Sequence, residues 1–197
     1  DQMIKLMSSK VACFLCKDEE RKDNYELYEY AVYIILSSVF HIATIIVLGL
    51  CFNLLVESLV LYFSYIAIRK FAGGYHAKTP ARCYLCSLLI SIIILSAIKL
   101  FCCTNIYILT LLIVIEILCV ILISRIAPLD SDNNPLNSKE KKYYRKVSRV
   151  ISTALLCISI ITIRLNYIKV GVSIMLGIFM SAGVLLARYV QNVINRY

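Results

Sequence analysis

His76 and Cys83 are the two residues of this chain whose types and spacing could perform covalent chemistry together. They lie seven positions apart in a polar segment, 69–83, that joins two apolar stretches. An imidazole that accepts the thiol proton would convert such a cysteine into a nucleophile for acyl transfer. The spacing permits a Cys–His pair, and the fold must supply the rest of the geometry.

The residues around Cys83 favour a reactive thiolate. Gly73-Gly74 predicts the end of the preceding helix and a position that permits φ > 0 or a close backbone approach. Thr79-Pro80 is typical of a helix start, with an N-cap residue followed by proline at the first helical position. Cys83 then falls in the first turn or just beyond, where the helix dipole and the adjacent Arg82 stabilise negative charge.

Two other interpretations of these residues remain open. In the first, the glycine pair is only a turn, His76 is a structural side chain and Cys83 is a small apolar residue. The second is a zinc site, because Cys13-x-x-Cys16 and Cys83-x-x-Cys86 match a four-cysteine spacing. Zinc ligands of this kind lie in polar turns, whereas both pairs here lie within apolar helical patterns. We therefore expect no metal and no cofactor.

The elements that must position this segment are membrane helices. Of the 197 residues, 60% are apolar and 17% are charged, whereas soluble domains have about 25% charged residues. The apolar runs lack the alternating polarity of barrel strands, so we expect an all-α, polytopic membrane bundle in a single domain, 1–197. Six spans are predicted, at Tyr30–Leu50, Leu54–Ile68, Ala81–Ile98, Ile106–Ile126, Val150–Ile163 and Ile168–Ala187.

The positions of lysine and arginine predict the orientation of the chain. With six spans and the N-terminus inside, 18 of the 21 basic residues fall on the cytoplasmic side, and only Lys99, Arg164 and Lys169 fall outside. Both termini, the segment 69–83 and the basic loop 127–149 are thus expected in the cytoplasm of a bacterial plasma membrane. This distribution explains the net charge of +9 without a nucleic-acid partner.

Two further segments are expected at the membrane surface. Residues 1–24 have an apolar stripe at helical spacing together with a basic complement, which predicts an interfacial amphipathic helix. The stripe consists of Ile4, Met7, Val11, Phe14 and Leu15. That helix either docks another amphipathic helix or anchors the bundle. The loop 127–149 opens with a turn-rich stretch and continues as the basic run 139–149, which is typical of contact with anionic lipid.

These motifs resemble the AgrB family, whose members process quorum-sensing peptides. The resemblance rests on Arg69, then Gly73-Gly74-Tyr75-His76-Ala77, then Cys83, all between the second and third spans of a chain of 197 residues. The later string Ala127-Pro128-Leu129-Asp130, followed by Pro135-Leu136 and a basic helix start, is also similar to the family pattern. With the amphipathic N-terminus, the resemblance covers nearly the whole chain.

The resemblance implies a cysteine endopeptidase that removes the C-terminal tail of an AgrD-like propeptide. Cys83 would be the nucleophile and His76 the base, and an internal cysteine or serine of the peptide would attack the acyl-enzyme to give a thiolactone or lactone. It also implies a homodimer. Arg69 and Gly74 match motif positions. The stretch 129–134 lacks the lysine often found before the second proline, which leaves substrate contacts there open.

Three carboxylates are candidates for a functional role. Two of them could assist His76. Asp130 is expected to orient the imidazole on account of its loop position, with Glu57 as the second choice. The alternative function is a noncatalytic transporter or peptide exporter that uses the intramembrane Glu57 and Glu116. Neither carboxylate has an obvious cationic partner in a neighbouring span, which favours the enzyme.

Overall fold

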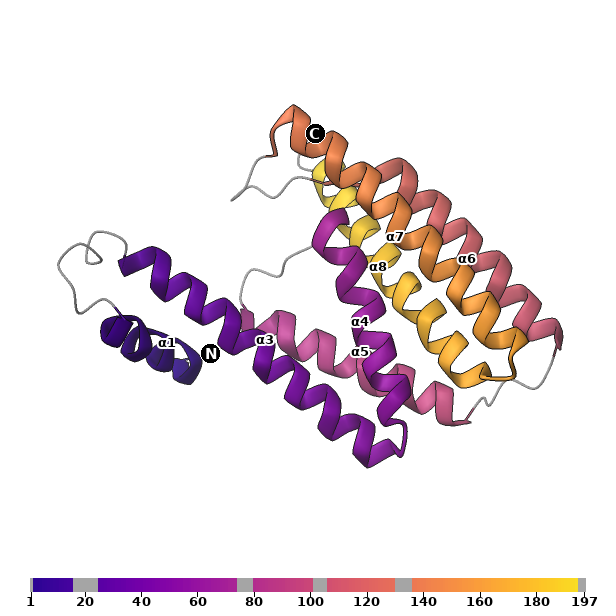
Figure 1. Ribbon diagram of the computed structural model, residues 1–197, viewed down its shortest axis with the longest axis horizontal. Coiled ribbons are helices and arrows are strands. Elements are labelled where there is room, and N and C mark those ends of the chain that lie inside the picture. Colours follow the sequence, from indigo (N-terminus) through magenta and orange to yellow (C-terminus); the bar gives the residue numbers. More distant parts are fainter. Residues whose placement is uncertain (1, 16–24, 74–79, 101–105, 130–135, 195–197) are drawn as a thin grey trace.

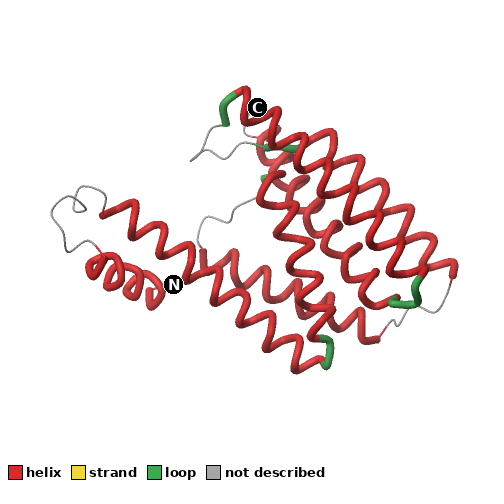
Figure 2. Tube along the Cα trace, in the orientation of Figure 1, coloured by secondary structure: helices red, strands yellow, loops and turns green. Residues whose placement is uncertain are grey.

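The computed structural model describes residues 2–15, 25–73, 80–100, 106–129 and 136–194, and these ranges are helical apart from short connections (Figures 1 and 2). This confirms the all-α class. The helices are α1 (Gln2–Leu15), α3 (Tyr25–Phe52), α4 (Leu55–Ala72), α5 (Pro80–Leu100), α6 (Ile106–Ile126), α7 (Ser138–Arg164) and α8 (Ile168–Ile194).

The helices other than α1 correspond to the six expected spans. Four of them, α3, α6, α7 and α8, are long and apolar enough to cross a membrane, and α5 contains a shorter apolar stretch. The 18 residues of α4 carry Glu57 in the first turn and Arg69 and Lys70 in the last. Large apolar side chains such as Ile35 and Leu111 are about 60% exposed, as expected where lipid is the solvent. The chain is therefore a multi-pass membrane protein.

The fifth of these helices, α7, begins at Ser138, twelve residues before the predicted Val150. The basic run 139–149 is thus helical, whereas the sequence pattern places it in a loop. The backbone N–H of Asn137 donates a 2.8 Å hydrogen bond to the Glu140 carboxylate, which is one half of a capping box. With 27 residues, α7 is about 40 Å long, so its first turns extend beyond a hydrocarbon core of about 30 Å.

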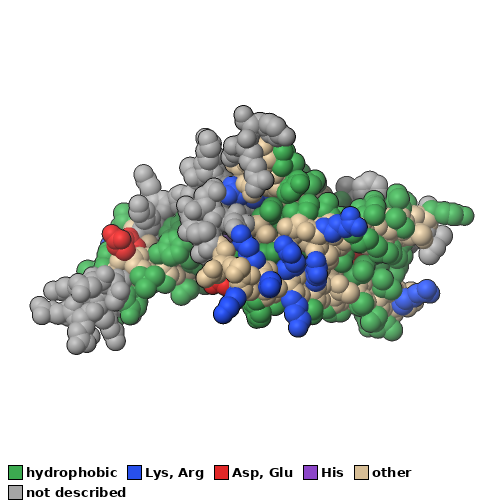
Figure 3. All heavy atoms as spheres, turned by 90° about the horizontal axis from the view of Figure 1, so that it is seen from above, with side chains coloured by type: hydrophobic (Ala, Val, Ile, Leu, Met, Phe, Trp, Pro, Cys, Tyr) green, Lys and Arg blue, Asp and Glu red, His purple; other side chains and the backbone are tan. Residues whose placement is uncertain are grey.

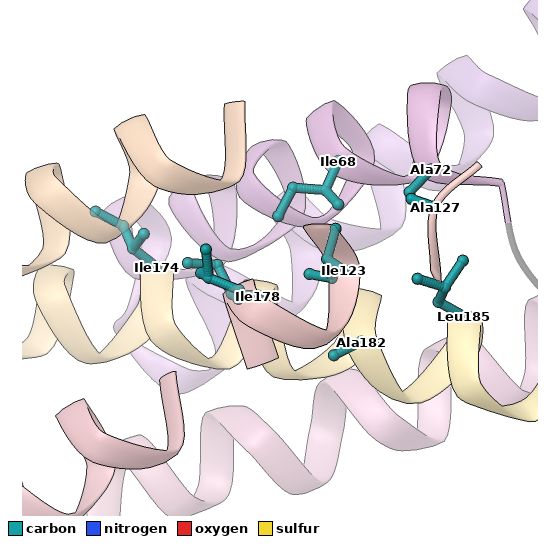
Figure 4. Close-up of a cluster of buried hydrophobic side chains, with 9 residues drawn as sticks. Ile68, Ala72, Ile123, Ala127, Ile174, Ile178, Ala182 and Leu185 are labelled. Atoms are coloured by element: carbon teal, nitrogen blue, oxygen red, sulfur yellow. The ribbon is translucent and has the colours of Figure 1, made fainter. Parts of the chain in front are cut away.

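The bundle is built around α8, which packs against α4, α6 and α7. More than half of the apolar window of α8 is buried, against 11% for α3 and 22% for α6. Its buried side chains meet those of α4 and α6 in one apolar cluster (Figure 4). The cluster consists of Ile68, Ala72, Val120, Ile123, Ala127, Ile174, Ile178, Ala182 and Leu185.

Small residues allow α4 and α8 to approach closely. A Cβ at Gly177 would lie 2.8 Å from the Ser64 Cβ and 3.0 Å from the carbonyl oxygen of Leu61. One turn along α8, the Ser181 hydroxyl lies 3.3 Å from the carbonyl oxygen of Tyr65. Close packing of this kind is the main source of helix association in lipid, where burial of apolar surface contributes little.

The N-terminal part of the structure lies to one side of this bundle, where α3 contacts α1, α4 and α5 (Figure 1). On α1, Ser8 and Ala12 are fully buried, while Met7, Val11 and Phe14 are 51%, 40% and 69% exposed. Ser8 and Ala12 therefore face the packing partner of α1, whereas Met7, Val11 and Phe14 of the predicted apolar stripe face away from it. The remainder of the predicted amphipathic segment, residues 16–24, lies outside the described residues.

Candidate active site

The segment expected to carry the chemistry begins at the end of α4. The Arg69 side chain donates a hydrogen bond from Nη1 to the Tyr65 hydroxyl one turn earlier. Its guanidinium carbon lies 5.5 Å from the centroid of the Tyr65 ring, which is a cation–π distance. The backbone N–H of Gly73 bonds the Arg69 carbonyl at 3.1 Å, and the helix ends there. Arg69 is thus oriented by its own helix.

Gly73 fulfils both expectations that the glycine pair raised. Its φ is +75° and its ψ is −155°, a conformation that residues with a Cβ rarely adopt. A Cβ at this position would lie 2.5 Å from the carbonyl oxygen of Leu129. Leu129 also donates its backbone N–H to the carbonyl oxygen of Ala72 at 3.1 Å. The segment that follows α6 is therefore fixed against the point where α4 ends.

Two arginines of α7 in turn hold the end of α6. Arg145 Nε donates to the Ala127 carbonyl at 3.2 Å, and Arg149 Nε donates to the Ser124 carbonyl at 3.0 Å. Carbonyls at a helix C-terminus lack intrahelical partners and carry partial negative charge, so a guanidinium suits them. Figure 3 shows Lys and Arg side chains gathered on the end of the bundle that includes these turns. Sequence reasoning assigned this run to lipid contact and missed its role in joining α6 to α7.

After residues 74–79, α5 begins at Pro80, as the Thr79-Pro80 pair predicts. Cys83 is the fourth residue of this helix and therefore lies in its first turn. Backbone N–H groups at such a helix start have no intrahelical partner and can bind an anion. His76, Gly74 and Asp130 lie outside the described residues, as does the side chain of Cys83.

The residue after Cys83 is held by α3. The hydroxyls of Tyr84 and Thr44 lie 2.8 Å apart, and the Tyr84 ring makes tilted and edge-on contacts with the rings of Phe40 and His41, with centroid distances of 5.4 and 4.9 Å. Sequence reasoning passed over His41, although it is one of only two histidines in the chain.

Of the two carboxylates considered as support for His76, the structure describes only Glu57. It lies in the first turn of α4, whereas the 69–83 segment starts from the last turn. Twelve residues of helix separate Glu57 from Arg69, which corresponds to about 18 Å. Glu57 and Gly73 thus lie at opposite ends of α4, and the support of His76 by Glu57 stays a prediction.

Glu116, which the transporter alternative requires, is fully buried between α6 and α7. The Ser159 hydroxyl lies 2.7 and 2.9 Å from its two carboxylate oxygens and 2.8 Å from the Leu156 carbonyl. A hydrogen-bonded pair of this kind joins two helices in lipid. The structure thus gives Glu116 a structural role.

The described ranges contain no group of three His, Cys, Asp or Glu side chains that could hold a metal ion. Cys13 and Cys86 are free and exposed, on α1 and α5. Cys16 lies outside the described residues, so the four-cysteine alternative stays untested.

Comparison with known proteins identifies the family. The sequence profile of AgrB, accessory gene regulator B, matches residues 8–185. The chain belongs to the AgrB family. The matched region runs from α1 to α8 and includes the whole 69–83 segment. Membership implies peptidase activity in the processing of an autoinducing propeptide.

Two relatives match this chain over most of their own length. Two putative AgrB-like proteins of Clostridium perfringens strains are 32% and 33% identical to this chain, over 185 and 171 residues. These alignments cover 92% and 85% of this chain, and 85% and 78% of the relatives. Protein FsrB of Enterococcus faecalis is 35% identical over 78 residues, which is 40% of this chain and 31% of FsrB. No solved structure matches significantly.

Proposed function

We propose that this AgrB-family chain is a cysteine endopeptidase that cleaves the C-terminal tail from an AgrD-like propeptide and promotes cyclisation of the remainder. The observation that carries the proposal is the position of Cys83 in the first turn of α5. A thiol at a helix N-terminus is favoured as thiolate, which is the nucleophilic form.

In the proposed reaction, His76 accepts the thiol proton and the Cys83 sulfur attacks the carbonyl carbon of the scissile peptide bond. Backbone N–H groups at the start of α5 hold the oxyanion of the tetrahedral intermediate. The C–N bond then breaks, and the proton on His76 passes to the departing amine of the tail. The peptide core remains attached to Cys83 as a thioester.

Cyclisation follows by attack on this thioester. The thiol or hydroxyl of an internal cysteine or serine of the peptide attacks the carbonyl carbon, and the Cys83 sulfur leaves and recovers a proton. The product is a thiolactone or a lactone, and no cofactor takes part. A site at the membrane interface favours this outcome because it limits the access of water to the thioester.

The geometry around the end of α4 supports roles for Arg69, Gly74 and Asp130 in the site. Arg69 is held beside the turn by Tyr65, and Gly74 follows a glycine whose backbone meets Leu129. Asp130 directly follows Leu129 in the chain, which makes it a better candidate than Glu57 for orienting His76. The exposed apolar face of α1 is suited to retain the propeptide on the cytoplasmic surface, where confinement raises its effective concentration. The functional unit is expected to be a homodimer.

The test is co-expression with the short peptide gene that neighbours the coding sequence, followed by mass analysis of the products. The expected products are a free C-terminal tail and a core lighter by one water than the corresponding linear peptide. Cys83→Ala should abolish both, since removal of a covalent nucleophile costs several orders of magnitude in rate. Cys86→Ala, on an exposed position one turn further along α5, is the matched control and should retain activity. Tail release by purified Cys83→Ala would refute the assignment.

A further inference from the structure

The second histidine of the chain, His41, belongs to a small cluster that holds the residue next to Cys83. Phe40, His41 and Thr44 lie at positions i, i+1 and i+4 of α3, so they share one face of that helix. All three contact the Tyr84 side chain. We refer to Phe40, His41 and Thr44 as the Tyr84 seat.

The hydrogen bonds of the seat have a defined direction. The Thr44 hydroxyl lies 2.9 Å from the carbonyl oxygen of Phe40, one turn back along its own helix. A hydroxyl has a single proton, so when Thr44 donates it to this carbonyl its oxygen is left as an acceptor. The Tyr84 O–H then donates to Thr44. The result is a chain from Tyr84 through Thr44 to the α3 backbone, in which each bond strengthens the next.

The seat is a polar and aromatic contact on a helix whose apolar window is only 11% buried. Ser38 lies one turn earlier on α3, and its hydroxyl bonds the carbonyl oxygen of Ile34 within the same helix. Further along α3, Leu48 and Phe52 pack against the apolar cluster that includes Leu95 and Ile98 of α5. The seat adds a hydrogen bond between the two helices at the start of α5, next to Cys83.

A second contact joins the same two helices near their other ends. Lys99 Nζ lies 5.9 Å from the centroid of the Phe52 ring. Thr44 precedes Phe52 on α3, and Tyr84 precedes Lys99 on α5, so the two helices run in the same direction (Figure 1). The two contacts differ in one respect: Tyr84 adjoins Cys83, whereas Lys99 is far along the helix.

We propose that the seat formed by His41, Phe40 and Thr44 is a positioning device that holds Tyr84 and thereby fixes the first turn of α5, with Cys83, against α3. His41 is a positioning residue that packs its ring against Tyr84 and takes no proton from the substrate. The inference rests on the proposed function, in which Cys83 is the nucleophile.

The experiment uses the full-length chain with every cysteine except Cys83 replaced by alanine or serine, after propeptide cleavage by this background has been verified. Two quantities are measured for each variant: kcat and KM for the propeptide, and the rate of Cys83 alkylation by iodoacetamide across a range of pH. Alkylation reports on Cys83 without any substrate. Membrane insertion and the thermal midpoint in detergent identify variants that fail to fold.

Tyr84→Phe and Thr44→Val remove the same hydrogen bond, so each should lower kcat about 3- to 10-fold, with KM nearly unchanged. The double variant should be no worse than either single one. His41→Phe keeps a ring in the seat and should stay within about twofold of the parent, whereas His41→Ala should lose at least as much as Tyr84→Phe. The variants should rank in the same order by Cys83 alkylation rate as by kcat. Lys99→Met, the control on the same pair of helices, should change neither quantity.

Three results would overturn the inference. The first is an alkylation rate in Tyr84→Phe and His41→Ala equal to that of Lys99→Met. The second is a fall in thermal midpoint that accounts for every loss of activity. The third is His41→Phe as inactive as Cys83→Ala, which would give His41 a chemical role. If Cys83→Ala still cleaves, the proposed function fails, while the alkylation series still decides whether the seat positions this turn.

Discussion

The backbone N–H of Leu129 donates a hydrogen bond to the carbonyl oxygen of Ala72, the last residue of α4, at 3.1 Å. This single bond links the segment after α6 to the beginning of the candidate active segment, and Gly73 makes the approach possible. The two parts of the sequence that carry the family resemblance are therefore in direct contact.

Gly73→Ala should disable propeptide processing. The new Cβ would lie 2.5 Å from the Leu129 carbonyl oxygen, and alanine disfavours a φ of +75°. Strain of this type amounts to about 1–3 kcal/mol, which the chain would relieve by displacing 127–129 or the start of the 74–79 segment. Gly183→Ala is the matched control, because its Cβ would meet nothing within 4 Å. Cleavage assays and thermal midpoints in detergent would compare the two, and equal activity would contradict the role of this contact.

Arg145→Gln should lower both thermal stability and processing, because it removes the guanidinium that bonds the Ala127 carbonyl. The expected loss is about 1 kcal/mol, since the side chain is partly solvated. Lys146→Gln makes the same change in charge at an exposed neighbouring position and should have little effect. If the two variants behave alike, the basic run acts through its total charge and the specific bond is unimportant.

Ser159→Ala should destabilise the contact between α6 and α7. The buried Glu116 carboxyl would lose its hydroxyl partner, at a cost of about 1–3 kcal/mol. Ser152→Ala provides the comparison, because the Ser152 hydroxyl is equally buried but bonds the Arg149 carbonyl within its own helix. Unfolding in mixed detergent micelles would measure both, and a Ser159→Ala variant as stable as Ser152→Ala would contradict the structural role of Glu116. Glu116→Gln should be tolerated, since an amide can still bond Ser159.

Reporter fusions at residues 140 and 167 should give opposite locations. Residue 140 lies in the first turn of α7, and residue 167 lies in the short connection to α8. A helix of 27 residues separates them, so both can lie on one side only if α7 does not cross the bilayer. The inside location is expected at 140, where the basic residues gather, and the outside location at 167. Identical readings would exclude the proposed topology.

Much of this arrangement could be predicted from local sequence signals. Thr79-Pro80 predicted the start of α5, and the glycine pair predicted both the end of α4 and a close backbone approach. Other features depend on packing between distant helices. The contact of His41 with Tyr84 follows from how α3 crosses α5, and no periodicity in either helix reports it. The early start of α7 was missed because its basic first turns lack the apolar pattern that marks a span, although Asn137 and Glu140 provided a capping signal.

The central place of α8 also determines when the protein can become active during its synthesis. Because α8 follows α4, α6 and α7 in the chain and packs against all three, those helices enter the membrane before their common partner exists. Until then, Ser64 on α4, close to Gly177 in the finished bundle, has only lipid or transient neighbours to contact. The ribosome must therefore complete α8 before α4 can settle into its final position. A chain that contains Cys83 but ends before α8 would lack the packing that holds α4, the helix from which the candidate active segment starts.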